Sequence, residues 1–402
     1  MHIVSTKTEA IQGVIKPPPS KSETIRAVFF GNLCTGTSHI RNMLASEDVS
    51  DAIKACAMMS ESSAVFTGSS GLTTRLMLPL LGLRANTSTP VTFDCGTQMR
   101  ARPMAGLINA LNQIGMNIDS SKWPLTVSGR LTGGTVALTE PISQFLSALL
   151  IALPLAENDS VITFPDIPAW SYVEMTLNWL KRLGILYTEH QNSITIPGNQ
   201  QYKAFDYTVP SDFSSASYFI AAAAMLGGSV RITGIDMNDT QGDKQLIEII
   251  QRMGGNIAFD GSDIMIHGSK FLNGVRIDAS NIPDLLPTLA VLGTAASGKT
   301  EIINAKQARL KETDRIHSMT EGLTRMGARI EESNDGMTIY SSKLSGASVK
   351  GYQDHRTVMA LSLAGLLAEG KTVIDDAASI HKTFPEFVTH MKSLGANMEI
   401  NA

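Results

Sequence analysis

A chain of 402 residues is too long for one ordinary hydrophobic core and predicts two or three domains. Hydrophobic residues make up 43%, charged residues 17% and aromatic residues 6% of the sequence, which is typical of a soluble globular protein. A net charge of −4 and few stacking side chains exclude an ordinary nucleic-acid binder. Any bound anion must therefore be held by a local cluster of cations.

Cysteine usage and the N-terminus bear on the compartment. Cys34, Cys56 and Cys95 are scattered and odd in number, which favours a reducing compartment and gives no metal-ligand spacing. The first residues, MHIVSTKTEA, lack the apolar core of a signal peptide, and no run approaches the roughly 18 apolar residues of a membrane span. We expect a cytoplasmic protein without a membrane partner.

The first informative stretch runs from Lys16 to Arg26 and reads KPPPSKSETIR. Its three prolines fix φ, so the chain is expected to run extended up to Ser20. A helix should begin there, which places Lys21, Ser22 and Arg26 near a helix N-terminus, where backbone dipoles favour an anion. A solvated helix start with ordinary surface charges explains the same residues.

Two patterns repeat along the chain. Short strands centred on Val or Ile follow small polar turns in six places, which begin at Gly36, Ser88, Asn158, Gly227, Gly298 and Gly370. Amphipathic helices that end in an apolar residue plus glycine recur about every 70 residues, with the glycines at 115, 184, 254, 327 and 395 and a degenerate copy at 58–60. We predict six helix-and-strand modules in two domains of three.

One segment imitates a phosphate-binding loop. Residues 293–300, GTAASGKT, match G-x-x-x-x-G-K-[ST] letter for letter. Such a loop needs a strand before it and a helix after it, whereas 283–296 reads as a helix and 300–304 as a strand. We predict an ordinary turn of the repeat and no nucleotide site.

Charged clusters fall at the junctions between modules. They are Arg75 after the small residues 68–71, Arg100 and Arg102 before Pro103, Lys311 to Arg315, Asp354 to Arg356, and Lys382. Each one alone reads as a helix-start cap. Cations at several helix starts oppose the helix dipole, however, and become favourable when an anion of several charges lies between them. The acidic members Asp284, expected at a helix N-cap or first turn, and Glu312 are candidates for moving protons.

These residues form an ordered set of motifs. The set is Ser20-Lys21-Ser22 with Arg26, Arg102-Pro103, Ser143-Gln144-Phe145, Asp212 with 214–219, Ile282-Pro283-Asp284, Lys311 to Arg315, Asp354 to Arg356, and Lys382 to Pro385. From Ser20 to about Phe387 the chain therefore resembles the 5-enolpyruvylshikimate-3-phosphate (EPSP) synthase family, the 3-phosphoshikimate 1-carboxyvinyltransferases.

The resemblance implies a two-domain, inside-out α/β barrel with six βαβαββ repeats, three in each domain. It places the crossovers near Pro18-Pro19 and Val209-Pro210, so that residues 1–18 and 210–402 form one domain and 19–209 the other. The active site would lie in the cleft, and the domains would close on substrate and exclude water.

The implied reaction moves the enolpyruvyl group of phosphoenolpyruvate to the 5-hydroxyl of shikimate 3-phosphate and releases phosphate. It proceeds by addition and elimination through a tetrahedral intermediate, with no metal and no organic cofactor. The expected protein is a monomer whose partners are these two small substrates.

The resemblance also implies residue roles. Asp284 would take the hydroxyl proton, and Glu312 with Lys21 would move the proton at the methylene carbon. Phosphoenolpyruvate would be bound by Lys21, Gly71, Arg102, Gln144, Arg315, His355, Arg356 and Lys382. Shikimate 3-phosphate would be bound by Lys21, Ser22, Arg26, Ser143, Gln144, Tyr172, Asp284, Lys311 and Gln307, which stands where the family has asparagine.

The chain departs from the family pattern around phosphoenolpyruvate. Of the motif Asn-Ala-Gly-Thr-Ala-x-Arg-Pro it keeps Gly71 and Arg75, but Leu72 replaces the threonine and Leu76 the proline. We expect altered affinity for phosphoenolpyruvate, and poor binding of glyphosate, which occupies its place in the family.

A second departure concerns the acceptor. Ile142 and Ala169 stand where the family has two serines that bind the acceptor phosphate. Each lost hydrogen bond to a charged group costs about 1.5–3 kcal/mol unless a neighbour such as Ser171 or Thr139 replaces it. A divergent paralogue that uses another hydroxyl acceptor therefore stays open as an alternative.

Two further alternatives are weaker. Cys95 before Arg102 is compatible with the sister family, UDP-N-acetylglucosamine enolpyruvyl transferase, which uses a loop cysteine, but Lys21-Ser22 and Lys311-Glu312 are typical of the shikimate branch. A non-catalytic binding protein on this fold would not require the carboxylates of Asp284 and Glu312.

Overall fold

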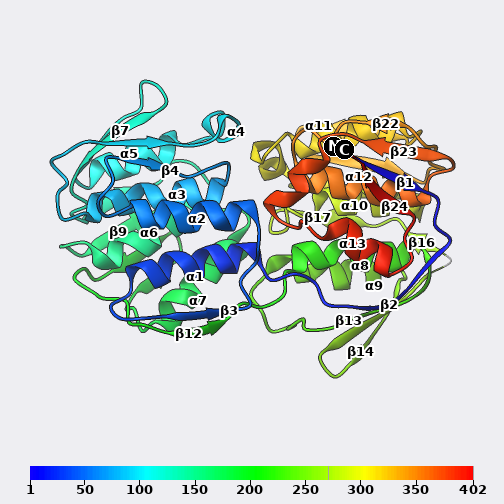
Figure 1. Cartoon of the computed structure of the whole chain (residues 1–402), viewed down its shortest axis with the longest axis horizontal. Helices are drawn as coiled ribbons and strands as arrows, with labels where there is room; N and C mark the ends of the chain where they lie inside the picture. Colours follow the sequence, from blue (N-terminus) through cyan, green and yellow to red (C-terminus); the bar gives the residue numbers. More distant parts are fainter. Residues whose placement is uncertain (270, 402) are drawn as a thin grey trace. The chain divides into compact units, whose positions relative to one another are not determined.

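The computed structural model describes residues 1–269 and 271–401. These residues divide into two compact units, the first of Met1–Ser20 with Pro210–Ala402 and the second of Lys21–Val209. Each unit has its own hydrophobic core, and the two cores share no buried residue. In Figure 1 the first unit has the green-to-red colours together with the dark-blue N-terminal strands β1 and β2, and the second unit has the blue-to-green colours.

The repeating module is clearest in the middle of the first unit. Strand β17 is parallel to β19, and β19 is antiparallel to β21, which pairs with β20 in a hairpin. The order along the chain is β17 (Arg276–Asp278), α10 (Leu286–Ala295), β19 (Lys299–Ile303), α11 (Arg315–Arg325), β20 (Ile330–Ser333) and β21 (Gly336–Tyr340). This is the expected βαβαββ order.

The other two large sheets of the first unit complete their modules with N-terminal strands. One sheet has the order β14-β15-β13-β2 and the other β22-β23-β1-β24. The first and last described strands lie in the latter, where β1 pairs with both β23 and β24 (Figure 1). The bounds are β1 (His2–Thr6), β2 (Ala10–Ile15), α8 (Phe213–Met225), β13 (Gly227–Ile232), α9 (Gln245–Arg252), β14 (Asn256–Asp260), β15 (Asp263–His267), β22 (Ser348–Val349), α12 (His355–Leu367), β23 (Lys371–Ile374), α13 (Phe387–Ser393) and β24 (Met398–Asn401).

The second unit contains two modules of the same kind and one reduced module. Its four-stranded sheets have the orders β4-β5-β7-β6 and β10-β11-β9-β8, and β3 and β12 form a two-stranded sheet. The bounds are α1 (Lys21–Leu33), β3 (His39–Arg41), α2 (Glu47–Met58), β4 (Ala64–Phe66), α3 (Gly71–Leu80), β5 (Val91–Asp94), α4 (Thr97–Arg100), α5 (Ala105–Gln113), β6 (Met116–Asp119), β7 (Leu125–Gly129), β8 (Thr135–Ala137), α6 (Ser143–Ala152), β9 (Ser160–Thr163), α7 (Trp170–Arg182), β10 (Thr188–His190), β11 (Ser193–Ile196) and β12 (Asp206–Thr208). The reduced module is the one with the degenerate repeat at 58–60.

Each unit has helices that are buried along almost their whole length. In the first unit these are α8, α10 and α12, and in the second they include α3 and α6. Apart from a few polar residues such as Arg75, Gln144 and Arg356, their sequences are apolar or small on every face, so they need other elements on all sides. In contrast α9 and α7 are amphipathic. Residues of the motifs lie at the N-terminal ends of the buried helices.

The repeat patterns read from the sequence are confirmed locally. The five glycines after helix ends, at 115, 184, 254, 327 and 395, all have positive φ between 71° and 96°. The GKT segment is a turn: α10 ends at Ala295, Gly298 has φ +78°, and β19 follows. A strand-then-helix phosphate loop is absent there, as predicted.

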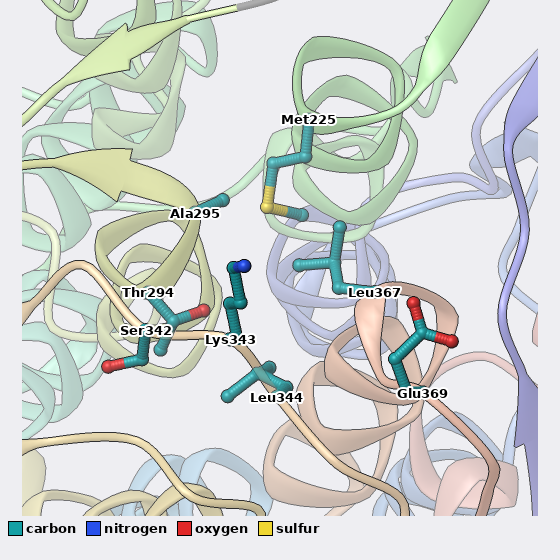
Figure 2. A pocket seen from close by; sticks show the side chains of 8 residues that line it. All are labelled: Met225, Thr294, Ala295, Ser342, Lys343, Leu344, Leu367 and Glu369. Carbon is teal, nitrogen blue, oxygen red and sulfur yellow. The ribbon is translucent and has the colours of Figure 1, made fainter.

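The C-terminal ends of the three buried helices of the first unit line a pocket of about 400 Å³. Figure 2 shows Met225, Ala295 and Leu367, the last residues of α8, α10 and α12, with Lys343 rising among them. Helix C-termini favour a cation, so Lys343 is explained by charge compensation. Glu369, which also lines the pocket, is paired with Lys7 at 2.6 Å.

The second unit has a counterpart pocket of about 300 Å³. There the cation is Arg130, which pairs with Glu157 at 2.8 Å. Leu33, Leu83 and Leu155, which line this pocket, are each the last residue of a helical segment. In the part of the chain that is described, no helix is long and apolar enough to cross a membrane.

Candidate active site

The first unit gathers three carboxylates around one buried arginine at the start of α11. Arg315 donates from Nη1 to Asp284 and from Nη2 to Glu312, each at 2.7 Å. It also makes a two-pronged contact with Asp354, at 2.7 Å from Nε and 3.1 Å from Nη2. The arginine side chain is 1% exposed. Arg315 therefore holds Asp284 and Glu312, the two proton-transfer candidates, in fixed geometry.

These three carboxylates stabilise the protonated, positively charged form of Arg315. Burial lowers its pKa, but Asp354, Glu312 and Asp284 together raise the pKa well above the ordinary value. Four of the N–H bonds of its guanidinium group point at carboxylate oxygens, which leaves one for other acceptors. Sequence reasoning assigned Arg315 to phosphoenolpyruvate and did not anticipate this role as an organiser.

Two further cations contact Asp284. Lys311 lies 3.1 Å from Oδ1, and Arg356, from the first turn of α12, lies 3.2 Å from Oδ2. Asp284 was expected at a helix N-cap or in the first turn, which is wrong, because Leu285 occupies the N-cap of α10 and Asp284 lies one residue before it. Its carboxylate is turned toward cations instead of capping the helix. Such a setting stabilises the ionised form that a base requires.

Three other predicted residues of this unit lie near the network. His355 is 1% exposed, with Nδ1 3.5 Å from Asp354. Lys382, at the end of a 3-10 helix (Ala377–Lys382), donates to the carbonyl of Gln353 at 3.0 Å. Gln307 is half-buried in the 3-10 helix Lys306–Leu310.

Sequence reasoning missed Asp243. This carboxyl group is 4% exposed and accepts a hydrogen bond from the Ser214 hydroxyl. Burial, with a smaller contribution from Asp284, raises its pKa to about 7, against the opposing effect of Arg356 and Ser214. In the sequence Asp243 follows Gln241-Gly242 and resembles any helix-start acid, so no local signal marks it.

Asp243→Asn should raise thermal stability at neutral and alkaline pH. Because the folded-state pKa of about 7 exceeds the ordinary 3.8, ionisation of this carboxyl group opposes folding. The penalty is absent below pH 3.8, grows toward about pH 7 and then levels off. Melting temperatures of the variant and the native protein should therefore agree near pH 4 and diverge toward pH 8.

The matched control for this measurement is Asp260→Asn, which changes an exposed carboxylate on β14. If the melting temperatures of Asp243→Asn and the native protein differed by the same amount at every pH, this would contradict the raised pKa of Asp243.

In the second unit, Lys21 opens α1 and is paired with a residue that the sequence did not single out. Its Nζ lies 2.8 Å from Asp48 Oδ2, and the two side chains are 15% and 6% exposed. Asp48 stands in the first turn of α2, where an acid also suits the helix dipole. The pair holds the ammonium group of Lys21 in place with little freedom.

Arg26 was predicted to bind shikimate 3-phosphate, and the structure places it at 0% exposure. It donates to Thr176 Oγ1 at 2.9 Å and to the carbonyls of Tyr172 at 2.8 Å and Ser22 at 3.1 Å. Burial lowers its pKa to about 10. Arg26 therefore ties α1 to α7, and it positions the backbone of Ser22 and Tyr172, two other residues predicted for the acceptor.

Gln144, in the first turn of α6, is oriented by Arg75. Arg75 donates to Gln144 Oε1 at 2.6 Å and to the carbonyl of Pro103 at 2.9 Å, and it lies over the ring of Phe145. Because its oxygen is engaged, the amide of Gln144 can offer its N–H groups to an anion. Ser143 precedes it at the first position of α6.

Arg102 packs against Gly71 at the start of α3. A Cβ at Gly71 would lie 2.6 Å from Arg102 Nη1. Leu72 and Leu76, the two departures from the family pattern, are both buried in the same helix. In contrast Arg100 pairs with Asp94 at the surface, at 2.7 Å.

The resemblance assigns Arg102 to phosphoenolpyruvate. With that role, Gly71→Ala should displace the guanidinium group of Arg102 and raise the KM for phosphoenolpyruvate by about tenfold, the cost of misplacing one charged contact. The KM for the acceptor should change less. Gly31→Ala is the matched control, because its added Cβ would meet Ile40 only at an ordinary 3.4 Å. Steady-state kinetics at saturating acceptor measure the effect, and an unchanged KM would show that Arg102 does not contact this substrate.

No group of three or more His, Cys, Asp or Glu side chains suited to a metal ion occurs within residues 1–269 and 271–401. The three cysteines are free thiols, and burial raises the pKa of Cys95, and likewise of Cys56, to about 12. A thiol with that pKa is a poor nucleophile, which disfavours the loop-cysteine interpretation of Cys95.

The fold defines a class: two-unit α/β proteins that are built from βαβαββ modules. Comparison with solved structures supports this, because EPSP synthase from Acinetobacter baumannii superposes with a TM-score of 0.83, 26% identity and full coverage of both chains. The model of the EPSP synthase family, 3-phosphoshikimate 1-carboxyvinyltransferase, matches residues 5–65 and 58–391.

Curated relatives agree over nearly the whole chain. The 3-phosphoshikimate 1-carboxyvinyltransferase of Ruminiclostridium cellulolyticum is 40% identical, covering 97% of this chain and 98% of its own. The enzyme of that name from Methanocaldococcus jannaschii is 37% identical, with 99% coverage of both chains. This chain belongs to the EPSP synthase family.

Proposed function

We propose that this chain transfers the carboxyvinyl group of phosphoenolpyruvate to the 5-hydroxyl of shikimate 3-phosphate. A new C–O bond forms to that hydroxyl oxygen, its proton is removed, and the C–O bond to phosphate breaks. The observation that carries the proposal is the placement of Asp284 and Glu312 on one guanidinium group, each 2.7 Å from Arg315. Addition and elimination need one group to take a proton from the hydroxyl and another to move a proton at the methylene carbon.

Asp284 is the base for the acceptor hydroxyl. Lys311, Arg315 and Arg356 all lie within 3.2 Å of its carboxylate, which stabilises the charge that a base needs before it accepts a proton. Glu312 moves the proton at the methylene carbon, with the ammonium group of Lys21 as the second member of that step. When bound substrate displaces water from the site, the charge interactions of Asp284 with Lys311, Arg315 and Arg356 become stronger.

The remaining cations hold the charged parts of the substrates. Phosphoenolpyruvate is bound by Lys21, Gly71, Arg102, Gln144, Arg315, His355, Arg356 and Lys382. Shikimate 3-phosphate is bound by Lys21, Ser22, Arg26, Ser143, Gln144, Tyr172, Asp284, Gln307 and Lys311. Arg315 and Arg26 support neighbouring groups more than they offer donors of their own, because their guanidinium groups already bind protein oxygens.

We propose that the protein acts in the cytoplasm as a monomer. Free thiols support a reducing compartment.

A second candidate function, transfer to a different hydroxyl acceptor, is favoured by one observation. Ile142 is the N-cap of α6 and Ala169 the N-cap of α7, and neither side chain can cap a helix or bind a phosphate. Both stand where the family resemblance places serines.

The deciding experiment measures phosphate release from phosphoenolpyruvate with shikimate 3-phosphate and, separately, with shikimate. Turnover at micromolar shikimate 3-phosphate supports the proposed acceptor. No turnover in a protein that still binds phosphoenolpyruvate would mean that the chemistry is kept and the acceptor is different.

A further inference from the structure

A strained turn precedes the helix that carries His355 and Arg356. Tyr352 has φ +55° and Gln353 has φ +53°, so two successive residues with a Cβ adopt the left-handed conformation. That conformation is unfavourable for such residues and persists only where surrounding contacts enforce it. Strain of this kind, next to candidate binding residues, points to a positioning role.

Backbone contacts hold the turn from one side. The N–H of Gly351 donates to Asp375 Oδ1 at 2.5 Å, and the N–H of Gln353 donates to Asp376 Oδ2 at 3.1 Å. Gly351 is required because an added Cβ would lie 2.4 Å from Val358 and 2.5 Å from the Asp375 carbonyl. These contacts fix where the turn lies.

A side-chain contact holds it from the other side. The hydroxyl of Tyr352 donates to the carboxylate of Glu321 on α11, the helix that Arg315 opens. Burial and this bond raise the pKa of Tyr352 to about 12, and the same bond lowers the pKa of Glu321. At neutral pH the phenol is therefore protonated and the carboxylate is charged, which is the strong form of the contact.

The left-handed turn helps to position two cations, Lys382 and Arg356. The carbonyl of Gln353 accepts from Lys382 Nζ at 3.0 Å. The next residue, Asp354, is the N-cap of α12 and accepts from the backbone N–H of Arg356 and from Arg315. A change to an ordinary φ would rotate the peptide plane and turn the Gln353 carbonyl away from Lys382.

We propose that Tyr352 is a positioning residue for phosphoenolpyruvate. Its bond to Glu321 keeps the turn left-handed, and the turn then fixes the ammonium group of Lys382 and the start of α12 with Arg356. Tyr352 acts through these groups. The inference rests on the proposed function, in which Lys382 and Arg356 hold phosphoenolpyruvate.

The test compares native protein, Tyr352→Phe and Glu321→Gln in steady-state kinetics. Tyr352→Phe should raise the KM for phosphoenolpyruvate about tenfold, with kcat and the KM for shikimate 3-phosphate changed less than about twofold. Glu321→Gln keeps an acceptor for the phenol and should give a smaller increase. The matched control is Tyr340→Phe, which should behave like the native protein. Tyr340 is the last residue of β21, and the guanidinium group of Arg329 lies over its ring.

A double-mutant cycle separates positioning from stability. In a Lys382→Met background Tyr352→Phe should lose most of its effect on the KM for phosphoenolpyruvate, because both changes remove the same contribution. A lowered melting temperature with an unchanged KM would overturn the inference and leave Tyr352 a structural residue. If Tyr352→Phe does not fold, Glu321→Gln decides: no rise in KM refutes the role. Native protein without turnover would refute the proposed function and this inference together, whereas an active native protein isolates the role of Tyr352.

Discussion

Glu312→Gln should lower kcat for phosphate release by about a thousandfold, within the range that a positioned proton-transfer group supplies. Glutamine has the same size and still offers an oxygen to Arg315 Nη2, now 2.7 Å from the carboxylate. The contacts of Arg315 with Asp284 and Asp354 therefore remain, and the fold should be kept. What disappears is the group that exchanges a proton with the methylene carbon, so the loss should fall on kcat and leave both KM values within a few-fold.

The matched control is Glu331→Gln, which neutralises an exposed carboxylate on β20 that lies 3.4 Å from Arg329. It should retain native kcat. The measurement is phosphate release with both substrates saturating, together with melting temperatures of all three proteins. A Glu312→Gln variant with native kcat would favour a different proton-transfer group or revive the non-catalytic alternative.

The fold was predictable where its signals are local. A glycine that ends a helix requires a left-handed residue, so Gly115, Gly184, Gly254, Gly327 and Gly395 mark the module period in the sequence. Helices that are apolar on every face, such as α8 and α10, predict from their sequence that they are buried on every side. The pairing of β1 with β23 and β24 carries no such signal, because strands more than 360 residues apart find each other only when the whole unit assembles.

The candidate site was predictable as a set of charges but not as a network. Helix-start cations and acids such as Lys311, Glu312 and Asp354 stand out in the sequence. Their pairing does not, because Arg315 and Asp354 meet across 39 residues and Arg356 and Asp284 across 72. Asp48 and Asp243 look like ordinary helix-start acids until the fold places them beside Lys21 and Ser214. The phosphate-loop match at residues 293–300 shows that a local motif can also mislead, since this one lacks the preceding strand and the following helix that a phosphate site needs.

The double variant Ile142→Ser with Ala169→Ser should lower the KM for shikimate 3-phosphate by about a hundredfold, at about tenfold for each hydrogen bond restored to a charged group. Ile142 caps α6 without a side-chain hydrogen bond, so a serine there can also accept an N–H of the first turn. Ala169 has φ +57° at the start of α7, a conformation that costs serine no more than alanine. The fold should therefore tolerate both hydroxyls.

The control Ile142→Ala removes the same apolar side chain, 8% exposed in the native protein, without adding a hydroxyl. It separates the loss of packing from the gain of a phosphate contact, and it should not lower the KM. Steady-state kinetics with shikimate 3-phosphate and with shikimate complete the argument, because restored hydroxyls should help only the phosphorylated acceptor. Equal gains for both acceptors, or none for either, would show that residues 142 and 169 do not contact the phosphate. A native protein that already binds shikimate 3-phosphate at micromolar concentration, and a double variant that matches it, would mean that Ser171 or Thr139 supplies the missing contacts.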